Sequence, residues 1–177
     1  MQIRAALADG ERELATIYGR GAEARMLLAH ALGVSQSYLL AHGEDEVAAA
    51  TLITYHTYLS RAQKHEPLPY ILGTAPFFNL TLKVTPAALI PRPETEQLVE
   101  QVVRWAKKQA QPDLVGVDIG TGTGCIVIAL AQKLPQAHLS AVDISPMALD
   151  LAHENARLYQ DWRGELLFYR SVIFSNQ

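Results

Sequence analysis

The sequence predicts an α/β protein in which a helical N-terminal bundle precedes part of a doubly wound parallel sheet. Three observations lead to this prediction. Residues 1–66 carry apolar positions at helical spacing, residues 67–92 are rich in proline, and residues 93–177 alternate helical stretches with short apolar runs. We therefore expect a helical domain over 1–66, a linker with a β-hairpin over 67–92, and a partial α/β domain over 93–177.

The helical segment contains one short and one longer predicted helix. Apolar residues at helical spacing fill 22–32, and Gly33 is expected to end that helix. A longer helix is expected from Glu44 to Glu66, where Pro67 stops it. The segment has no catalytic constellation, so it either docks a protein partner or serves as a structural cap.

The linker contains short β-prone pieces, Phe77–Leu80 and Leu82–Val84, which predict a hairpin. A helix is then expected from about Pro93 to Ala110, with Pro93 in its first turn and acidic residues at the positive end of its dipole. The α/β unit is expected to follow as strand 114–119, helix 123–133, strand 138–143, helix 146–159 and strand 165–170.

A glycine-rich turn follows the first predicted strand of that unit. Gly120, Gly122 and Gly124 alternate with Thr121 and Thr123, and such a turn brings a ligand against bare backbone amides at a helix start. Asp118 lies just before the turn, and Asp143 ends the next predicted strand. That spacing of about 20 residues is typical of a carboxylate that holds a ribose diol. The unit therefore predicts an adenosine-containing cofactor.

The pattern D-x-G-x-G-x-G favours one class of cofactor. A carboxylate at Asp118 would repel a pyrophosphate but suits a ligand with a cationic amino acid end. S-adenosylmethionine carries an ammonium group and a sulfonium and has no phosphate, so it fits best. A nicotinamide cofactor and a plain α/β unit without a cofactor remain open on these residues alone.

Composition narrows the function classes. The formal net charge of −3 and the pI near 6.0 indicate no excess of basic residues of the kind that binds nucleic acid. A single cysteine, Cys125, excludes an internal disulfide and a cysteine-based zinc site, and the six histidines show no metal-binding spacing. With no signal peptide, membrane-spanning run or lipidation motif, we expect a cytoplasmic protein with no membrane partner.

These residues resemble a known family, the HemK/PrmC-type peptide chain release factor glutamine methyltransferases. The resemblance covers almost the whole chain, and its most specific part is the string Ile-Pro-Arg-Pro-Glu-Thr-Glu. The matching segments are Ala24–His30, His65–Gly73, Phe77–Phe78, Leu89–Glu96, and Asp118–Gly124 together with Asp143.

The resemblance implies a helical domain that recognises a class I peptide chain release factor. It also implies the first half, strands 1 to 3, of a class I (Rossmann-like) S-adenosylmethionine-dependent methyltransferase domain. The implied substrate is the glutamine of a Gly-Gly-Gln motif, which is methylated on its side-chain amide nitrogen.

The resemblance also implies site roles. Gly120, Thr121, Gly122, Thr123 and Gly124 would pack on the methionine part of the cofactor, with Asp118 near its ammonium and Asp143 on the ribose hydroxyls; the backbone N–H of Ile173 would reach the adenine, and Arg92, Pro93, Glu94 and Glu96 would line the cofactor and substrate mouth. It assigns no catalytic residue and no metal ligand within this sequence.

Two departures from the family pattern bear on activity. Members of the family bind the substrate amide with an Asn-Pro-Pro-Tyr motif, which these 177 residues lack. In addition, Val172 occupies the position where the family usually has an aspartate that faces the adenine amino group. Strand 114–119 would also have a bare apolar edge. We therefore expect weak cofactor binding at best and no methyl transfer by this chain alone. Two alternatives are a non-catalytic fragment that binds a release factor through its helices and, against the mild acidity, a DNA adenine methyltransferase.

Overall fold

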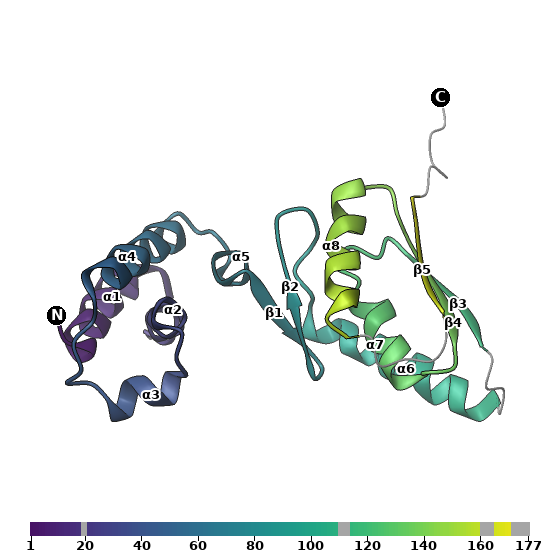
Figure 1. Cartoon of the computed structure of the whole chain (residues 1–177), viewed down its shortest axis with the longest axis horizontal. Coiled ribbons are helices and arrows are strands. Elements are labelled where there is room, and N and C mark those ends of the chain that lie inside the picture. The colour runs from purple at the N-terminus through teal and green to yellow at the C-terminus, as the bar shows by residue number, and fades with distance from the viewer. Residues whose placement is uncertain (19–20, 110–113, 160–164, 171–177) are drawn as a thin grey trace. The chain divides into compact units, whose positions relative to one another are not determined.

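A computed structural model describes residues 1–18, 21–109, 114–159 and 165–170 of the chain. The contacts divide the chain into two compact units, Met1–Leu72 and Gly73–Gln177, each with its own hydrophobic core (Figure 1). The elements of the first unit are α1 (Ile3–Tyr18), α2 (Ala22–Leu32), α3 (Gln36–Ala41), α4 (Ala49–Gln63) and α5 (Leu68–Leu72). Those of the second are β1 (Thr74–Phe77), β2 (Leu80–Lys83), α6 (Pro93–Gln109), β3 (Val115–Ile119), α7 (Cys125–Lys133), β4 (His138–Asp143), α8 (Pro146–Arg157) and β5 (Leu166–Arg170).

The first unit is a helical bundle in which α1, α2 and α4 pack on one another. Leu27 and Leu28 of α2 and Tyr55 and Leu59 of α4 are completely or almost completely buried in its core. As expected, α2 ends at Gly33, which has a φ of 69° and donates its N–H to carbonyls of the last turn. Each of these helices buries one apolar face in the shared core, and this packing produces the predicted bundle.

The expected long helix from Glu44 to Glu66 is wrong at its start, because α4 begins only at Ala49. The preceding residues pair with the N-terminus instead: Ile3 donates its N–H to the Asp45 carbonyl, and Val47 donates to that of Met1. These bonds satisfy backbone groups that a helix would otherwise have used.

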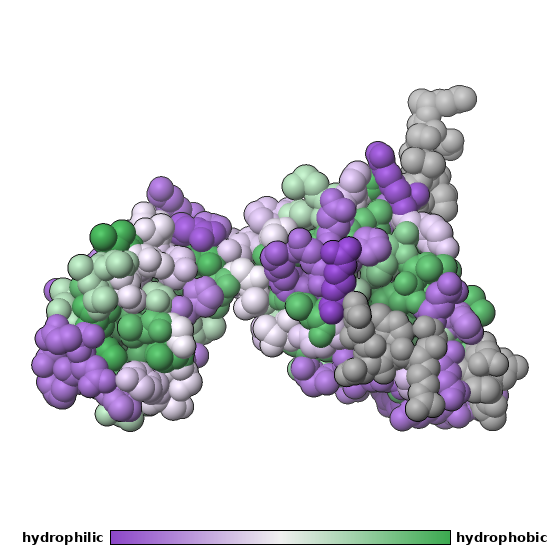
Figure 2. All heavy atoms as spheres, viewed as in Figure 1, coloured by the Kyte–Doolittle hydropathy of each residue, from purple (hydrophilic) through white to green (hydrophobic). Residues whose placement is uncertain are grey.

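The second unit contains a three-stranded parallel sheet in the order β3-β4-β5. In Figure 1, α6, α7 and α8 lie on one side of this sheet. On the opposite face Val115, Val117 and Ile119 are 81%, 59% and 76% exposed. Figure 2 shows hydrophobic atoms at the surface over the sheet. Parallel strands usually have both faces covered, so this face is unusually bare.

The strand expected at 114–119 begins at Val115, and the helix expected at 123 begins at Cys125, because Thr123 and Gly124 still belong to the turn. The helix expected at 146–159 ends at Arg157, and β5 begins at Leu166. These are differences of one or two residues at element ends. Ala110, the expected end of the helix that begins at Pro93, lies outside the described residues.

The hairpin β1–β2 belongs to the second unit, because Phe77, Leu80 and Leu82 are buried in the same core as α7. The piece Phe77–Leu80, expected as one β-prone segment, contains the hairpin turn, and Phe78 within it has a φ of 52°. The pair Phe-Asn at the turn is not one of the usual two-residue hairpin signals, which explains the error.

Candidate functional site

The carboxyl ends of β3 and β4 place two carboxylates close to one loop. The two strands are parallel, with Asp118 opposite Ala141 and Ile119 opposite Val142, and Asp143 is the last residue of β4. Carboxyl ends of parallel strands are where open α/β sheets bind ligands. The two acidic residues predicted from the sequence therefore lie at the functional edge of the sheet.

The glycine loop, residues 120–124, is held by hydrogen bonds to both strands. The backbone N–H groups of Gly120 and Thr121 donate to the Val142 carbonyl at 2.8 and 3.0 Å. The Thr121 hydroxyl donates to an Asp118 carboxylate oxygen at 2.7 Å, and the Gly122 N–H donates to Asp143 Oδ2 at 2.9 Å. The loop is thus fixed between the two carboxylates.

Asp143 also orders the start of α8. Its Oδ1 atom accepts a hydrogen bond from the Ser145 N–H at 2.9 Å, and Ser145 in turn caps the helix by accepting from the Ala148 N–H. A carboxylate has about four lone-pair positions, so two backbone bonds leave Asp143 able to accept from a ligand diol.

Gly124 needs to be glycine at the helix start. Its φ is 79°, and a Cβ placed there would come within 3.0 Å of the Ile128 Cδ1 atom and 3.2 Å of the Ala152 Cβ atom. This close approach packs α7 against α8 behind the loop. On the other side, the Ala88 Cβ atom is 3.6 Å from the position that a Cβ of Gly122 would occupy, so the segment before α6 lies beside the loop.

The electrostatics of Asp118 favour a cationic ligand. Burial raises the pKa of its carboxyl group, and the hydrogen bond from Thr121 opposes this shift only in part. Among the residues that the structure describes, none forms a salt bridge with Asp118 or Asp143. A positive ligand group beside Asp118 would therefore stabilise its ionised form.

The Ile-Pro-Arg-Pro-Glu-Thr-Glu segment opens α6. Arg92, Pro93 and Glu94 are exposed there. Glu96 accepts a hydrogen bond from the Phe78 N–H at 2.8 Å, which ties the first turn of α6 to the hairpin turn. Glu96 thus has an evident structural role, whereas the other three side chains are accessible to a partner.

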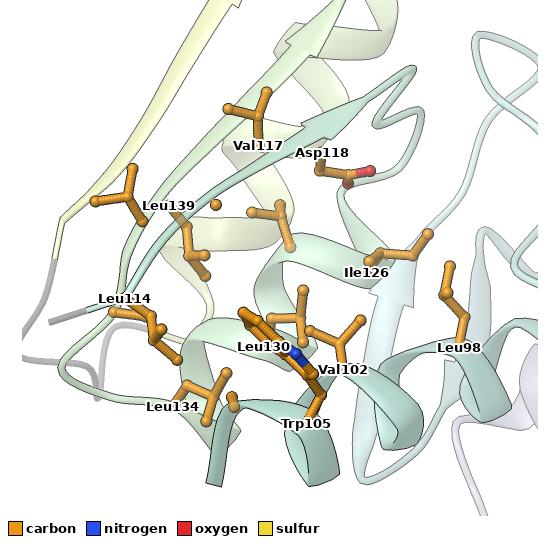
Figure 3. A pocket seen from close by; sticks show the side chains of 15 residues that line it. Leu98, Val102, Trp105, Leu114, Val117, Asp118, Ile126, Leu130, Leu134 and Leu139 are labelled. Atoms are coloured by element: carbon orange, nitrogen blue, oxygen red, sulfur yellow. The ribbon is translucent and has the colours of Figure 1, made fainter. Parts of the chain in front are cut away.

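An apolar groove of about 230 Å³ runs along β3, next to the glycine loop but not lined by it. Figure 3 shows Leu98, Val102 and Trp105 of α6 across from Ile126 and Leu130 of α7. Leu98 and Trp105 are about half exposed, and among the described residues Asp118 is the only acidic one that lines the groove. Because β3 is an edge strand of the described sheet, its open side borders this groove.

No helix within the described ranges is long and apolar enough to cross a membrane, and those ranges hold no cluster of three or more residues suited to a metal ion. Cys125 is buried at the start of α7, and burial raises the pKa of its thiol. A buried thiol with a raised pKa is a poor nucleophile.

Comparison with known proteins identifies the family. Residues 5–73 match the family model of the PrmC N-terminal domain, and residues 96–169 match that of the methyltransferase small domain. A release factor glutamine methyltransferase from Vibrio cholerae is 43% identical over 134 residues, which cover 76% of this chain and 46% of that protein. One from Escherichia coli is 40% identical over 164 residues, covering 87% and 58%. The chain belongs to the release factor glutamine methyltransferase family.

The chain spans about half the length of the curated family members that it matches. Among solved structures, the TYW2 protein of P. horikoshii in complex with MeSAdo is 20% identical, with a TM-score of 0.44 over 55% of this chain and 34% of that one. A ribosomal protein L11 methylase from Lactobacillus delbrueckii is 28% identical, with a TM-score of 0.37 over 48% and 42%. The second unit has the class I methyltransferase fold indicated by its family match.

Of the site residues expected in this family, the structure brings together Asp118, the glycine loop and Asp143. Arg92, Pro93 and Glu94 lie at the start of α6. Ile173 and Val172 lie outside the described residues. The binding roles of all these residues stay predictions.

Sequence reasoning missed Asn155 of α8, which is completely buried and hydrogen-bonded to the Thr123 carbonyl of the glycine loop. A signal was present, because Asn155 shares a helical stripe with the buried residues Leu151 and Ala152. A polar residue in such an apolar stripe needs a hydrogen-bond partner elsewhere in the structure.

Proposed function

We propose that this chain binds S-adenosylmethionine at the glycine loop and forms the cofactor-binding part of an enzyme that methylates release factors. The observation that carries the proposal is the pair Asp118 and Asp143, bonded to one loop at the carboxyl ends of neighbouring strands. The names of the relatives support a release factor as substrate. The proposed target is the side-chain amide nitrogen of glutamine in a Gly-Gly-Gln motif of a class I release factor, which implies a cytoplasmic location.

The residues present fit S-adenosylmethionine. Asp118 would hold its ammonium group, and Asp143 would accept hydrogen bonds from its ribose hydroxyls. An ideal Cβ at Gly120 would meet no atom within 4 Å, so the loop leaves open space there for a ligand. The two carboxylates suit a ligand with a cationic amino acid end better than one with a pyrophosphate.

When bound, S-adenosylmethionine supplies a methyl group on a positively charged sulfur. The role of the chain is then to fix the direction of that group, because methyl transfer depends mainly on the alignment of the reactants. Asp118 would hold the amino acid end of the cofactor and Asp143 its ribose, on either side of the sulfonium, while the exposed Arg92, Pro93 and Glu94 would border the approach of the substrate. The helical unit would supply recognition of the release factor.

We propose further that the 177-residue chain alone does not turn over its substrate. The sequence has no Asn-Pro-Pro-Tyr motif to hold the amide nitrogen toward the methyl group. The apolar face at Val115, Val117 and Ile119 is also uncovered on the described sheet, which would weaken the support of the loop.

A calorimetric titration of the purified chain with S-adenosylmethionine, and with S-adenosylhomocysteine as a second ligand, tests the binding proposal. We expect saturable heat with both ligands and no methylation of a Gly-Gly-Gln-containing release factor. A folded chain, by circular dichroism, that gives no saturable heat with either ligand would refute cofactor binding. Methylation of the release factor, absent when its glutamine is replaced by alanine, would refute the proposed inactivity of the chain alone.

Asp118→Asn is expected to separate stability from binding. Because burial raises the pKa of Asp118 in the folded state, the folded chain holds more protons than the unfolded chain between the ordinary and the raised pKa. The free energy of unfolding therefore falls as the pH rises through that window, and at neutral pH the ionised carboxylate destabilises the folded chain. The asparagine variant avoids this cost and can still accept the Thr121 hydrogen bond.

We expect Asp118→Asn to have a higher melting temperature than the parent at pH 7, with the difference shrinking as the pH falls below the raised pKa. Its affinity for S-adenosylmethionine should nevertheless be lower, because the charge that faces the ammonium is gone. Thermal melts from pH 4 to 8 and calorimetry at pH 7 measure both effects. A variant that is less stable at pH 7 and binds as tightly as the parent would contradict the assigned role.

A further inference from the structure

The outer edge of the hairpin is paired with side chains of α8 and the residues that follow it. The Tyr159 hydroxyl accepts from the Thr81 N–H at 2.7 Å and donates to the Thr81 carbonyl at 2.8 Å. Asn155 does the same for Lys83: its Oδ1 atom accepts from the N–H at 2.7 Å, and its Nδ2 atom donates to the carbonyl at 2.9 Å. Both polar groups of two alternate strand residues are therefore satisfied by side chains.

The spacing of these four residues explains why they match. Positions four apart on a helix differ by roughly 6 Å along its axis, and positions two apart on a strand differ by roughly 6.6 Å. Asn155 lies in α8, and Tyr159 lies four positions later in the turn that continues the helix, where its N–H donates to the Ala156 carbonyl. Thr81 and Lys83 are two apart on β2. The side chains of Asn155 in α8 and of Tyr159, two residues beyond its end, thus act in place of a neighbouring strand.

Asn155 makes one further bond, which Tyr159 does not. Its Nδ2 atom also donates to the Thr123 carbonyl in the glycine loop at 2.9 Å. The side chain is completely buried, so its two N–H groups and its carbonyl oxygen are all used inside the protein. An aspartate of the same shape could not donate either bond, and an alanine could make none of the three.

We propose that Asn155 is a positioning residue that couples the hairpin to the glycine loop and so sets the affinity for S-adenosylmethionine. The affinity part rests on the cofactor binding proposed above, whereas the coupling of hairpin and loop does not. Asn155 acts through Thr123 and is not expected to touch the ligand.

The test compares Asn155→Asp with Tyr159→Phe in the 177-residue chain. The phenylalanine variant loses the bonds to Thr81 but keeps every bond to the loop, so it is the matched control. Hydrogen exchange should show faster exchange at the Gly122 and Gly124 amides in Asn155→Asp alone, and faster exchange at Thr81 in Tyr159→Phe. Calorimetry should show the dissociation constant for S-adenosylhomocysteine raised about tenfold in Asn155→Asp and unchanged in Tyr159→Phe.

Loop exchange at the parent rate in a folded Asn155→Asp would overturn the coupling, even if the parent chain bound no cofactor. An equal loss of affinity in both variants would overturn the specific role of Asn155, because general loosening of the hairpin would then explain it. If the buried carboxylate prevents Asn155→Asp from folding, native-state hydrogen exchange of the parent chain tests the proposal instead. The amides of Lys83 and Gly122 should then open in one cooperative step, and opening of Lys83 at a far lower free energy would refute the proposal.

Discussion

Gly124→Ala is expected to destabilise the second unit more than Gly120→Ala, although both residues have nearly the same φ, 79° and 78°. Both variants carry the cost of a left-handed backbone, about 1–2 kcal/mol for a residue with a Cβ. Only Gly124→Ala also forces a Cβ to within 3.0 Å of Ile128 and 3.2 Å of Ala152. That crowding adds about 1–3 kcal/mol.

Urea unfolding followed by tryptophan fluorescence measures this difference. Both tryptophans, Trp105 and Trp162, belong to the second unit, so the signal reports that unit without a contribution from the helical bundle. We expect a midpoint for Gly124→Ala well below that of Gly120→Ala, with similar slopes. Equal midpoints would mean that α7 and α8 can shift apart at no cost, contrary to the packing described here.

Asp143→Ala is expected to lower the affinity for S-adenosylmethionine by about 10- to 100-fold. The variant removes the acceptor of the Gly122 and Ser145 N–H groups and, with it, the proposed partner of the ribose hydroxyls. A hydrogen bond to a charged group contributes about 1.5–3 kcal/mol, and each step of about 1.4 kcal/mol is a factor of ten in affinity, so the loss of one such bond to the ribose accounts for an effect of this size.

Asp150→Ala is the matched control, because Asp150 carries the same charge on α8 but is exposed. Binding calorimetry should show that Asp150→Ala binds the cofactor as tightly as the parent. Thermal melts should show a lower melting temperature for Asp143→Ala but not for Asp150→Ala. If Asp143→Ala melted lower but bound the cofactor as well as the parent, Asp143 would order the loop without serving as a ligand. The proposed ribose contact would then be wrong.

Local patterns allowed the central part of this fold to be predicted. The glycine loop, Asp118 and Asp143 follow a strand–turn–helix–strand pattern in which each signal depends on its near neighbours, and the structure brings them together. The Ser145 cap of α8 is a signal of the same local kind, because a cap depends only on the next few residues.

The features that were missed depend on contacts between distant residues. Asn155 and Lys83 are 72 positions apart, and no local pattern pairs them. The start of α4 was misplaced because Asp45 and Val47 bond to the first residues of the chain. The hairpin turn was misplaced because Phe78 adopts a positive φ, which a bulky residue rarely does without tertiary support, here the Glu96 carboxylate on its N–H.

The bond between Asn155 and Thr123 has a thermodynamic consequence for the hairpin. Because one side-chain amide bonds to both Lys83 and the glycine loop, the proposed coupling implies that a ligand which stabilises the loop also stabilises the paired edge of β2. Linkage is reciprocal: if a ligand in the loop changes the affinity of the hairpin for a partner by some factor, binding of that partner changes the affinity of the loop for its ligand by the same factor. On the proposed coupling, the hairpin is expected to act as a second site whose occupation changes the affinity of the loop for its ligand.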